Sequence, residues 1–375
     1  NLDSTEALDM VTRRQFGSAS LALGAPALFQ GCTPHAGVKT YEEAARELWR
    51  HGEVDRGDAA ALRRELVRYA TLAPSSHNTQ CWKFGIEPQA ITILPDLSRR
   101  CPAVDPDDHH LFVSLGCAAE NLVQAARAHG FAALARPEGA HGALRIELEP
   151  APAQTSPLFQ AIPQRQSTRA EYDGRPLSND DLRALERAAA GDGVQLILLT
   201  DKPARERTLE FVVQGNSAQM RDPAFVDELK AWIRFSAGDA VRLGDGLYAA
   251  SSGNPSVPAW LGRLMFGAFF TERGENDKYA RQVRSSAGIA VFVGPADDKA
   301  GWIAVGRAFE RFALQATALG VRTAHLNQPV EVASLRPAFA SFLGVAGKRP
   351  DLVLRFGRGP ALPASLRRPL QAVLV

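Results

Sequence analysis

The chain has 375 residues, of which 45% are hydrophobic and 22% charged, and its 43 basic and 41 acidic residues give a net charge of +2. This is the composition of a globular protein with a large core, long enough for two lobes. The near balance of charge argues against a nucleic-acid partner. The four cysteines, Cys32, Cys81, Cys101 and Cys117, show no C-x-x-C spacing, so a zinc site of that type is not expected.

An export signal is predicted at the N-terminus. Arg13-Arg14 precede an uncharged, small and apolar run over residues 17–28, a pattern typical of a Tat signal; the alternative is a chance Arg-Arg before a core helix. The run is too short for a permanent membrane span. We therefore expect residues 1–32 to be a signal segment, and the protein to reach the periplasm or the outer face of the cell membrane. Membrane attachment is expected only if Cys32 is lipidated, and residues 29–32 are a poor lipobox.

The most informative stretch is the loop Pro74-Ser75-Ser76-His77-Asn78-Thr79-Gln80-Cys81-Trp82. It follows a predicted helix that Asp58 can cap, and it precedes two predicted strands over residues 83–87 and 90–94. A loop rich in hydroxyl and amide groups can offer several hydrogen bonds to a polar, planar ligand. Because Pro, Ser and Asn are also turn formers, composition alone leaves an ordinary turn as the alternative.

The order of residues in this loop resembles the A-P-S-x-x-N-x-Q-P-W signature of the nitroreductase superfamily, whose members bind FMN. Residues 73–82 match every signature position except Cys81, where the family usually has Pro. The resemblance implies that the loop packs on the isoalloxazine ring and hydrogen-bonds its polar rim. It assigns that role to Pro74, Ser75, Ser76, Asn78 and Gln80. Whether the Cys81 thiol tunes the flavin stays open.

An acidic segment with two histidines follows, Asp105-Pro106-Asp107-Asp108-His109-His110. These residue types could ligate a metal ion. Asp at the cap and first turn of a helix is the simpler interpretation, so we expect a helix to start here and no metal to bind.

Two long helices predict an internal repeat. One helix is predicted from about Leu111, and the other over residues 302–319. Both carry apolar or small residues at spacings of three and four, which form a narrow seam for another helix. At an offset of 190 residues Gly116 aligns with Gly306 and Glu120 with Glu310, although two Ala-rich helices can share some residues by chance. Nitroreductases are usually homodimers built around such a helix pair. We therefore expect an α+β, nitroreductase-like fold, internally duplicated as a pseudo-dimer with two long central helices and mixed sheets.

The proline-rich segment 149–164 predicts a linker between halves at residues 40–150 and 160–375. It is followed by Arg165-Gln166-Ser167-Thr168-Arg169, which is similar to the phosphate motif of nitroreductases. The resemblance assigns the phosphate side of FMN to Arg165 and Ser167, and the N1–C2 carbonyl region to Arg169. Guanidinium donors suit a phosphate, and a cation near N1 stabilises anionic reduced flavin. The alternative is a solvated basic loop.

Three later segments complete the expected site. Residues 201–285 form an aromatic-rich insertion with Gly hinges, which is either a lid over the flavin or plain packing. Residues 322–329 lie where the family places backbone over one flavin face, and Leu326 is our candidate there. Near the last predicted strand, Arg358 is the candidate basic residue close to the phosphate, and Arg367 and Arg368 are weaker ones.

The resemblance covers roughly residues 40–375 and is closest to the fused, Acg-like branch of the superfamily. It implies one FMN per chain, NAD(P)H as reductant, and ping-pong hydride transfer to a small nitroaromatic, quinone or enone, without an assigned catalytic side chain or a required oligomer. An exported protein meets little NAD(P)H, so another electron donor would be needed there. The alternative is an FMN-binding protein without turnover, whose flavin is covered by the lid.

Overall fold

The structure is a computed structural model that describes residues 39–55, 57–139 and 141–375. The predicted signal segment and Cys32 lie outside these residues. Within them, no helix combines the length and apolar character needed to cross a membrane.

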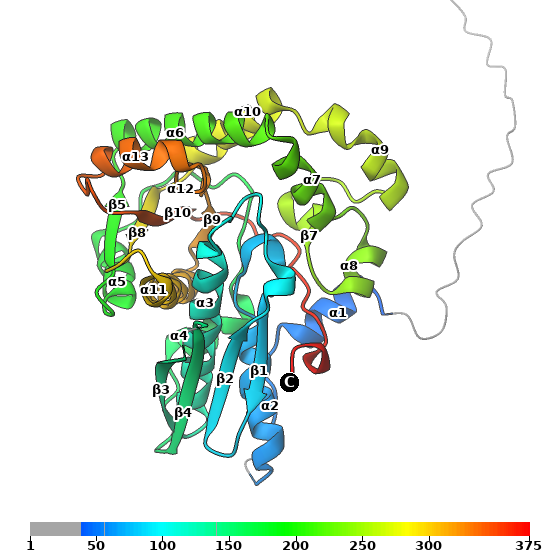
Figure 1. Cartoon of the computed structure of the whole chain (residues 1–375), viewed down its shortest axis with the longest axis vertical. Coiled ribbons are helices and arrows are strands. Elements are labelled where there is room, and N and C mark those ends of the chain that lie inside the picture. Colours follow the sequence, from blue (N-terminus) through cyan, green and yellow to red (C-terminus); the bar gives the residue numbers. More distant parts are fainter. Residues whose placement is uncertain (1–38, 56, 140) are drawn as a thin grey trace, which may run out of the picture. The chain divides into compact units, whose positions relative to one another are not determined.

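The first half of the chain builds one sheet and one long helix (Figure 1). Its elements are α1 (Tyr41–Leu48), α2 (Ala59–Thr71), β1 (Trp82–Ile86), β2 (Ala90–Pro95), α3 (His109–Ala128), β3 (Phe131–Glu138) and β4 (Ala143–Pro150). The strand order is β1-β2-β4-β3, and all neighbouring strands are antiparallel. Asp58 caps α2 as predicted, since its carboxylate accepts hydrogen bonds from the N–H groups of Ala60 and Ala61.

The second half repeats the same path and adds an insertion. Its framework elements are α5 (Asn179–Ala189), β5 (Gln195–Leu199), β8 (Gly288–Val293), α11 (Lys299–Ala318), β9 (Arg322–His325), α12 (Gln328–Glu331), α13 (Arg336–Phe342) and β10 (Pro350–Gly357). The strand order β5-β8-β10-β9 is again antiparallel throughout and matches β1-β2-β4-β3 position by position. The prediction of an internally duplicated α+β fold is confirmed.

The insertion after β5 is mostly helical. It contains α6 (Lys202–Met220), α7 (Pro223–Trp232), β6 (Ile233–Arg234), α8 (Ala237–Leu243), β7 (Leu247–Tyr248), α9 (Ala259–Phe269) and α10 (Glu272–Arg284). The predicted linker before Arg165 is partly helical too. Ser156 caps α4 (Pro157–Ala161) through the N–H of Phe159, and that phenyl ring is buried in the core.

Parallel pairing in the described residues is limited to β6 with β7 and to two isolated bridges, Phe84 with Leu374 and Ser167 with Thr323. The sheets are therefore mixed only at their edges. The first bridge carries the carboxyl-terminal tail to the first sheet, where Phe84 donates its N–H to Val373 at 2.8 Å and accepts one from Val375 at 3.0 Å. The tail of the second half thus completes the sheet of the first.

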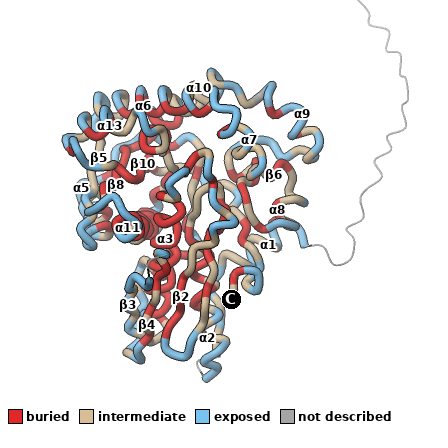
Figure 2. The backbone as a smooth tube through the Cα atoms, in the orientation of Figure 1, coloured by how far each residue is buried: buried red, intermediate tan, exposed pale blue. Residues whose placement is uncertain are grey.

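Helices α3 and α11 pack against each other at the centre of the duplicated fold, α3 on the first sheet and α11 on the second. Both are buried along most of their length (Figure 2). At their crossing Gly116 faces Gly306: a Cβ atom on either residue would lie 3.0 Å from the Cα atom of the other and would overlap the carbonyl oxygen of Ile303 or Val113. Ile303 and Val113 are related by the same offset of 190 residues, so the pseudo-twofold axis predicted from the sequence passes between the two glycines.

We expect Gly306→Ala to lower the free energy of unfolding by about 1–3 kcal/mol, because its methyl group has no space against the backbone of α3. Gly267→Ala is the matched control, since no atom lies within 4 Å of the added Cβ in α9. Alanine favours helix there, so this variant should be neutral or slightly stabilised. Urea unfolding monitored by tryptophan fluorescence compares the two, and equal stability of both variants would contradict the close crossing.

Candidate functional site

A cavity of about 600 Å³ lies between the loop after α2, the start of α3, the segment at the end of β9 and the insertion, whose helix α10 lines it. This volume is in the range of small-molecule and cofactor sites. One set of lining residues is polar or charged, among them Arg169, Glu275, Lys278 and Gln328. The other set is apolar and comes from the insertion, including Phe235, Leu261, Met265 and Phe266. The cavity can therefore accept a ligand with an apolar body and a polar edge.

The loop predicted to contact a flavin does line this cavity, through Pro74, Ser75, Ser76 and His77. His77, Asn78 and Gln80 all have φ values near +50°, a left-handed conformation that residues other than glycine rarely adopt. Such strain persists only where the surroundings enforce it. Here Ser75 Oγ accepts the N–H of Gln80 at 2.9 Å, which closes the loop on itself.

Asn78 and Gln80 hold this loop in place and do not line the cavity. Both are buried. Asn78 Nδ2 donates to the carbonyl oxygens of Gly246 at 3.0 Å and Leu366 at 3.2 Å, and Gln80 Nε2 donates to that of Gly244 at 2.8 Å. The two amides expected at the rim of the ring are thus engaged with the insertion and the tail, on the far side of the loop.

Arg367, a weak candidate from the sequence, is the main anchor of the loop. Its buried guanidinium donates to the carbonyl oxygens of Thr71 at 2.6 Å, Leu72 at 2.9 Å and Ala73 at 3.0 Å, and to Oδ1 of Asn78 at 3.1 Å. These acceptors are the end of α2 and the loop itself. Neighbouring arginines in a proline-rich tail carry no spacing that would predict such a contact.

Arg169 also lines the cavity, as the phosphate-motif resemblance predicted for a residue near the ligand. Its guanidinium makes no hydrogen bond or ion pair with any described residue. The carbonyl oxygen of Arg169 accepts a hydrogen bond from Nε2 of Gln282. Burial lowers the pKa of Arg169. A partly buried cation in a cavity wall, with no anionic partner among the described residues, favours a ligand that brings negative charge or a polarised carbonyl.

Two histidines of the cavity are held neutral. Burial lowers the pKa of His77 to about 4 and that of His325 to about 3, and the positive charge of Arg169 adds to both shifts. Nε2 of His77, Nδ1 of His325 and Oε1 of Gln328 are buried without a hydrogen-bond partner in the described residues. Three unsatisfied polar atoms and a free guanidinium fit a ligand with several hydrogen-bonding groups, as the rim of a flavin has.

The remaining predicted site residues lie away from the cavity lining. Arg165 is buried, with Nε 3.2 Å from Oε1 of Glu310 in the arrangement of an ion pair, and it donates to Leu72 O at 2.9 Å. Ser167 forms a bridge with Thr323, and Leu326 belongs to a hydrophobic cluster. Arg358 forms a half-exposed ion pair with Asp181 at 3.0 Å. The structure therefore brings together Pro74, Ser75, Ser76 and Arg169, and not the residues assigned to the phosphate.

Cys81, the departure from the signature, is a core residue. Its thiol is buried, and burial raises the pKa of Cys81 to about 12. It lies outside the cavity lining, so it packs behind the loop.

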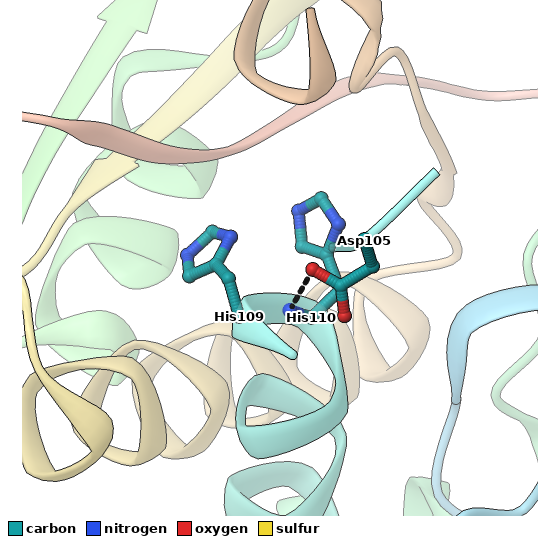
Figure 3. A group of neighbouring side chains, drawn as sticks. All are labelled: Asp105, His109 and His110. Atoms are coloured by element: carbon teal, nitrogen blue, oxygen red, sulfur yellow. Dashed lines mark hydrogen bonds between the residues drawn. The ribbon is translucent and has the colours of Figure 1, made fainter. Parts of the chain in front are cut away.

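A helix starts in this segment as predicted, but the prediction of acidic residues in its first turn is wrong, and the carboxylate that caps α3 is that of Asp105, which precedes the helix by four residues. Its carboxylate accepts the N–H of His110 at 3.1 Å (Figure 3). It also accepts the N–H of Leu111 at 3.0 Å. Asp108, the residue before the helix, has φ 60° and makes no side-chain cap hydrogen bond.

No protein-family model matches the sequence. Two proteins of Mycobacterium tuberculosis are similar over most of the chain. One, which carries the provisional name NAD(P)H nitroreductase Rv3131, is 27% identical over 332 residues, covering 83% of this chain and 90% of that protein. The other, the similarly named acg, is 22% identical over 319 residues, covering 82% and 93%.

Solved nitroreductase structures match about half of the chain. The FMN-bound nitroreductase of Bacteroides fragilis covers 55% of this chain and 90% of its own, at 16% identity and a TM-score of 0.35. The FMN-dependent nitroreductase NfnB of Mycobacterium smegmatis, in complex with NADPH, covers 54% and 87%, at 14% identity and the same TM-score. A TM-score of this size does not by itself assign a fold.

Proposed function

We propose that this chain is an FMN-dependent oxidoreductase of the nitroreductase type, which transfers hydride from NAD(P)H to a small nitroaromatic, quinone or enone by a ping-pong mechanism. The observation that carries the proposal is the meeting of the Pro74–His77 loop and the unpaired Arg169 at one cavity. The sequence motifs assigned these two elements to opposite parts of one isoalloxazine ring, and they come from different halves of the chain. The names of the relatives, matched over four fifths of the chain, support the same class.

The side chains have distinct parts in this proposal. FMN, when bound, would supply the hydride chemistry. Arg169 would hold the electron-rich edge of the ring and favour its anionic reduced form, while the loop backbone at Ser75 and Ser76 would lie against the ring. Phe235 and Phe266 line the cavity from the insertion and would exclude water. The position of these two phenyl rings supports the proposal that residues 201–285 form a lid over the flavin.

We further propose one FMN per chain and no requirement for a second subunit, because the loop of the first half and Arg169 of the second meet within a single chain. In this view residues 40–150 and 160–375 are the fused counterparts of two subunits. Export by residues 1–32 is part of the proposal. NAD(P)H is the reductant that the family resemblance implies and that the test in solution uses; outside the cytoplasm, where NAD(P)H is scarce, another donor would have to reduce the same flavin. We assign no group to the phosphate, since Arg165 and Ser167 are engaged elsewhere.

The visible spectrum of the protein purified without added cofactor tests the proposal. We expect flavin absorbance at one FMN per chain, and rapid bleaching when NADPH is mixed in under anaerobic conditions. Bound flavin that NADPH does not bleach would favour the FMN-binding protein without turnover. A colourless protein that fails to bind added FMN would contradict both functions.

Arg169→Gln is expected to weaken FMN binding by roughly 10- to 100-fold, because the variant loses a charge-assisted hydrogen bond of about 1.5–3 kcal/mol. It should also lower the flavin reduction potential, since the cation near the ring is gone. Arg175→Gln is the control, as this arginine lies in the same segment and is exposed. Fluorescence titration with FMN measures the first effect, and equal affinity of both variants would remove Arg169 from the site.

A further inference from the structure

Three buried side chains that can ligate a metal gather at the first turn of α3 (Figure 3). One ligand atom each of Asp105, His109 and His110 lies within 4.8 Å of the other two, and the centroids of the two imidazole rings are 4.5 Å apart. All three residues are at most 5% exposed. Zinc–nitrogen bonds of about 2.0–2.1 Å place tetrahedral ligand atoms roughly 3.4 Å apart, so small side-chain rotations would close the group around an ion.

One residue of β10 orients both imidazoles. Nε2 of His109 lies 2.9 Å from Oδ1 of Asp351, and Nε2 of His110 lies 3.2 Å from the carbonyl oxygen of the same residue. When the Asp351 carboxyl group is ionised, it and the carbonyl oxygen both accept hydrogen bonds, so each Nε2 carries the hydrogen and each Nδ1 presents a lone pair. Metal-ligating histidines are held in this way, with the second ring nitrogen donating to a carboxylate or a backbone carbonyl.

The Nδ1 lone pairs of His109 and His110 have no close hydrogen-bond donor among the described residues. Nδ1 of His109 has no hydrogen-bond partner in the described residues, although the side chain is 1% exposed. Buried acceptors without partners are rare and unfavourable. Nδ1 of His110 faces Oε1 of Glu331 at 3.9 Å, so a cation between them would gain a further carboxylate ligand.

The charge around the group also favours a cation. Asp105, Glu331 and Asp351 are three carboxyl groups in one region. Two arginines are also near: Arg349 is paired with Asp107 and Asp297, and Arg336 donates to the carbonyl oxygen of Val330. The start of a helix repels cations, and Asp105 already accepts two backbone N–H groups there. Each carboxylate oxygen keeps a second lone pair for a metal.

We propose that Asp105, His109 and His110, with Glu331 as fourth ligand and Asp351 as orienting residue, form a binding site for one divalent metal ion, best suited to Zn²⁺. Imidazole nitrogen and carboxylate oxygen are a ligand set that zinc accepts. His110 and Glu331 also line the cavity, so the ion borders the ligand site. The proposal does not depend on flavin binding.

The test uses the full chain without a histidine tag, stripped with EDTA and then titrated with Zn²⁺ and with Co²⁺. We expect one ion bound per chain, a rise in Tm with Zn²⁺, and visible Co²⁺ absorption of a four-coordinate site. Asp351→Asn should weaken Zn²⁺ binding by about 10- to 100-fold, and His109→Asn should abolish stoichiometric binding. His141→Asn, at an exposed histidine, is the matched control and should bind as the unchanged protein does.

The absence of stoichiometric Zn²⁺ binding by the folded, unchanged protein would overturn the proposal, as would full binding by His109→Asn. Circular dichroism reports whether each variant folds. If His109→Asn does not fold, the Zn²⁺ titrations of the unchanged protein and of Asp351→Asn decide. His109 is outside the cavity lining, so a protein that binds zinc but no flavin would contradict only the proposed oxidoreductase.

Discussion

Arg367→Met is expected to lower the free energy of unfolding by about 3–5 kcal/mol, because the variant leaves buried carbonyl groups and Oδ1 of Asn78 without their charged donor. Thr71, Leu72 and Ala73 supply those carbonyls at the end of α2. The loop over residues 74–80 would lose its main anchor, so FMN retention should fall together with stability. Urea unfolding and the flavin content of the purified variant measure the two effects.

Arg358→Gln is the matched control on the same tail. Its side chain is 41% exposed and its guanidinium pairs with Asp181, and an exposed ion pair contributes about 0–1 kcal/mol. A loss of stability in Arg367→Met no larger than in Arg358→Gln would refute the anchoring role of Arg367.

The second large expected effect is a fall in the free energy of unfolding at acidic pH. In the folded protein the pKa values of His77 and His325 are lowered to about 4 and about 3, whereas an unfolded histidine titrates near 6.5. The unfolded chain therefore takes up protons first as the pH falls. The stability that these neutral histidines contribute is complete above about pH 6.5 and is lost toward pH 3–4, at roughly 3 kcal/mol for His77 and roughly 5 kcal/mol for His325.

Two buried carboxyl groups act in the opposite direction. Burial raises the pKa of Asp351 and that of Glu310 to about 7, so their contribution is present below their ordinary range and is lost as the pH rises toward 7. The total stability curve combines both trends. The histidine part is isolated by the difference between the unchanged protein and the double variant His77→Asn, His325→Asn.

We expect this difference in free energy of unfolding to be constant from pH 7.5 to about pH 6.5 and to change steadily from there to pH 4.5, with the double variant losing less stability in acid. Urea unfolding at four pH values measures it, and His141→Asn serves as the control because its side chain is exposed. Parallel curves for the double variant and the unchanged protein would contradict the burial of both histidines as neutral groups.

Much of the framework could be predicted because it depends on local pattern. The periodicity of α3 and α11 indicated two seams, and the alignment of Gly116 with Gly306 located their crossing. Asp58 at the start of α2 could be predicted as its N-terminal capping residue. These features depend on residues close in sequence, or on two copies of one pattern.

The site was predicted only in part because its details depend on distant residues. Pro74, Ser75, Ser76 and Arg169 do meet at one cavity. The side chains of Asn78 and Gln80 turn away because Gly244, Gly246 and Leu366, from two remote segments, offer carbonyl oxygens on the other side. Arg165 lies in an ion-pair arrangement with Glu310 of α11. Nothing in the order of residues 74–80 or 165–169 indicates these partners.

The pairing of residues 373–375 with Phe84 has a practical consequence for handling the protein. A reporter or affinity tag fused after Val375 would lie next to the hydrogen bonds that join this tail to β1, and is expected to weaken them. Truncation before Val373 would also uncover β1 as an unprotected edge strand, which is a common template for aggregation.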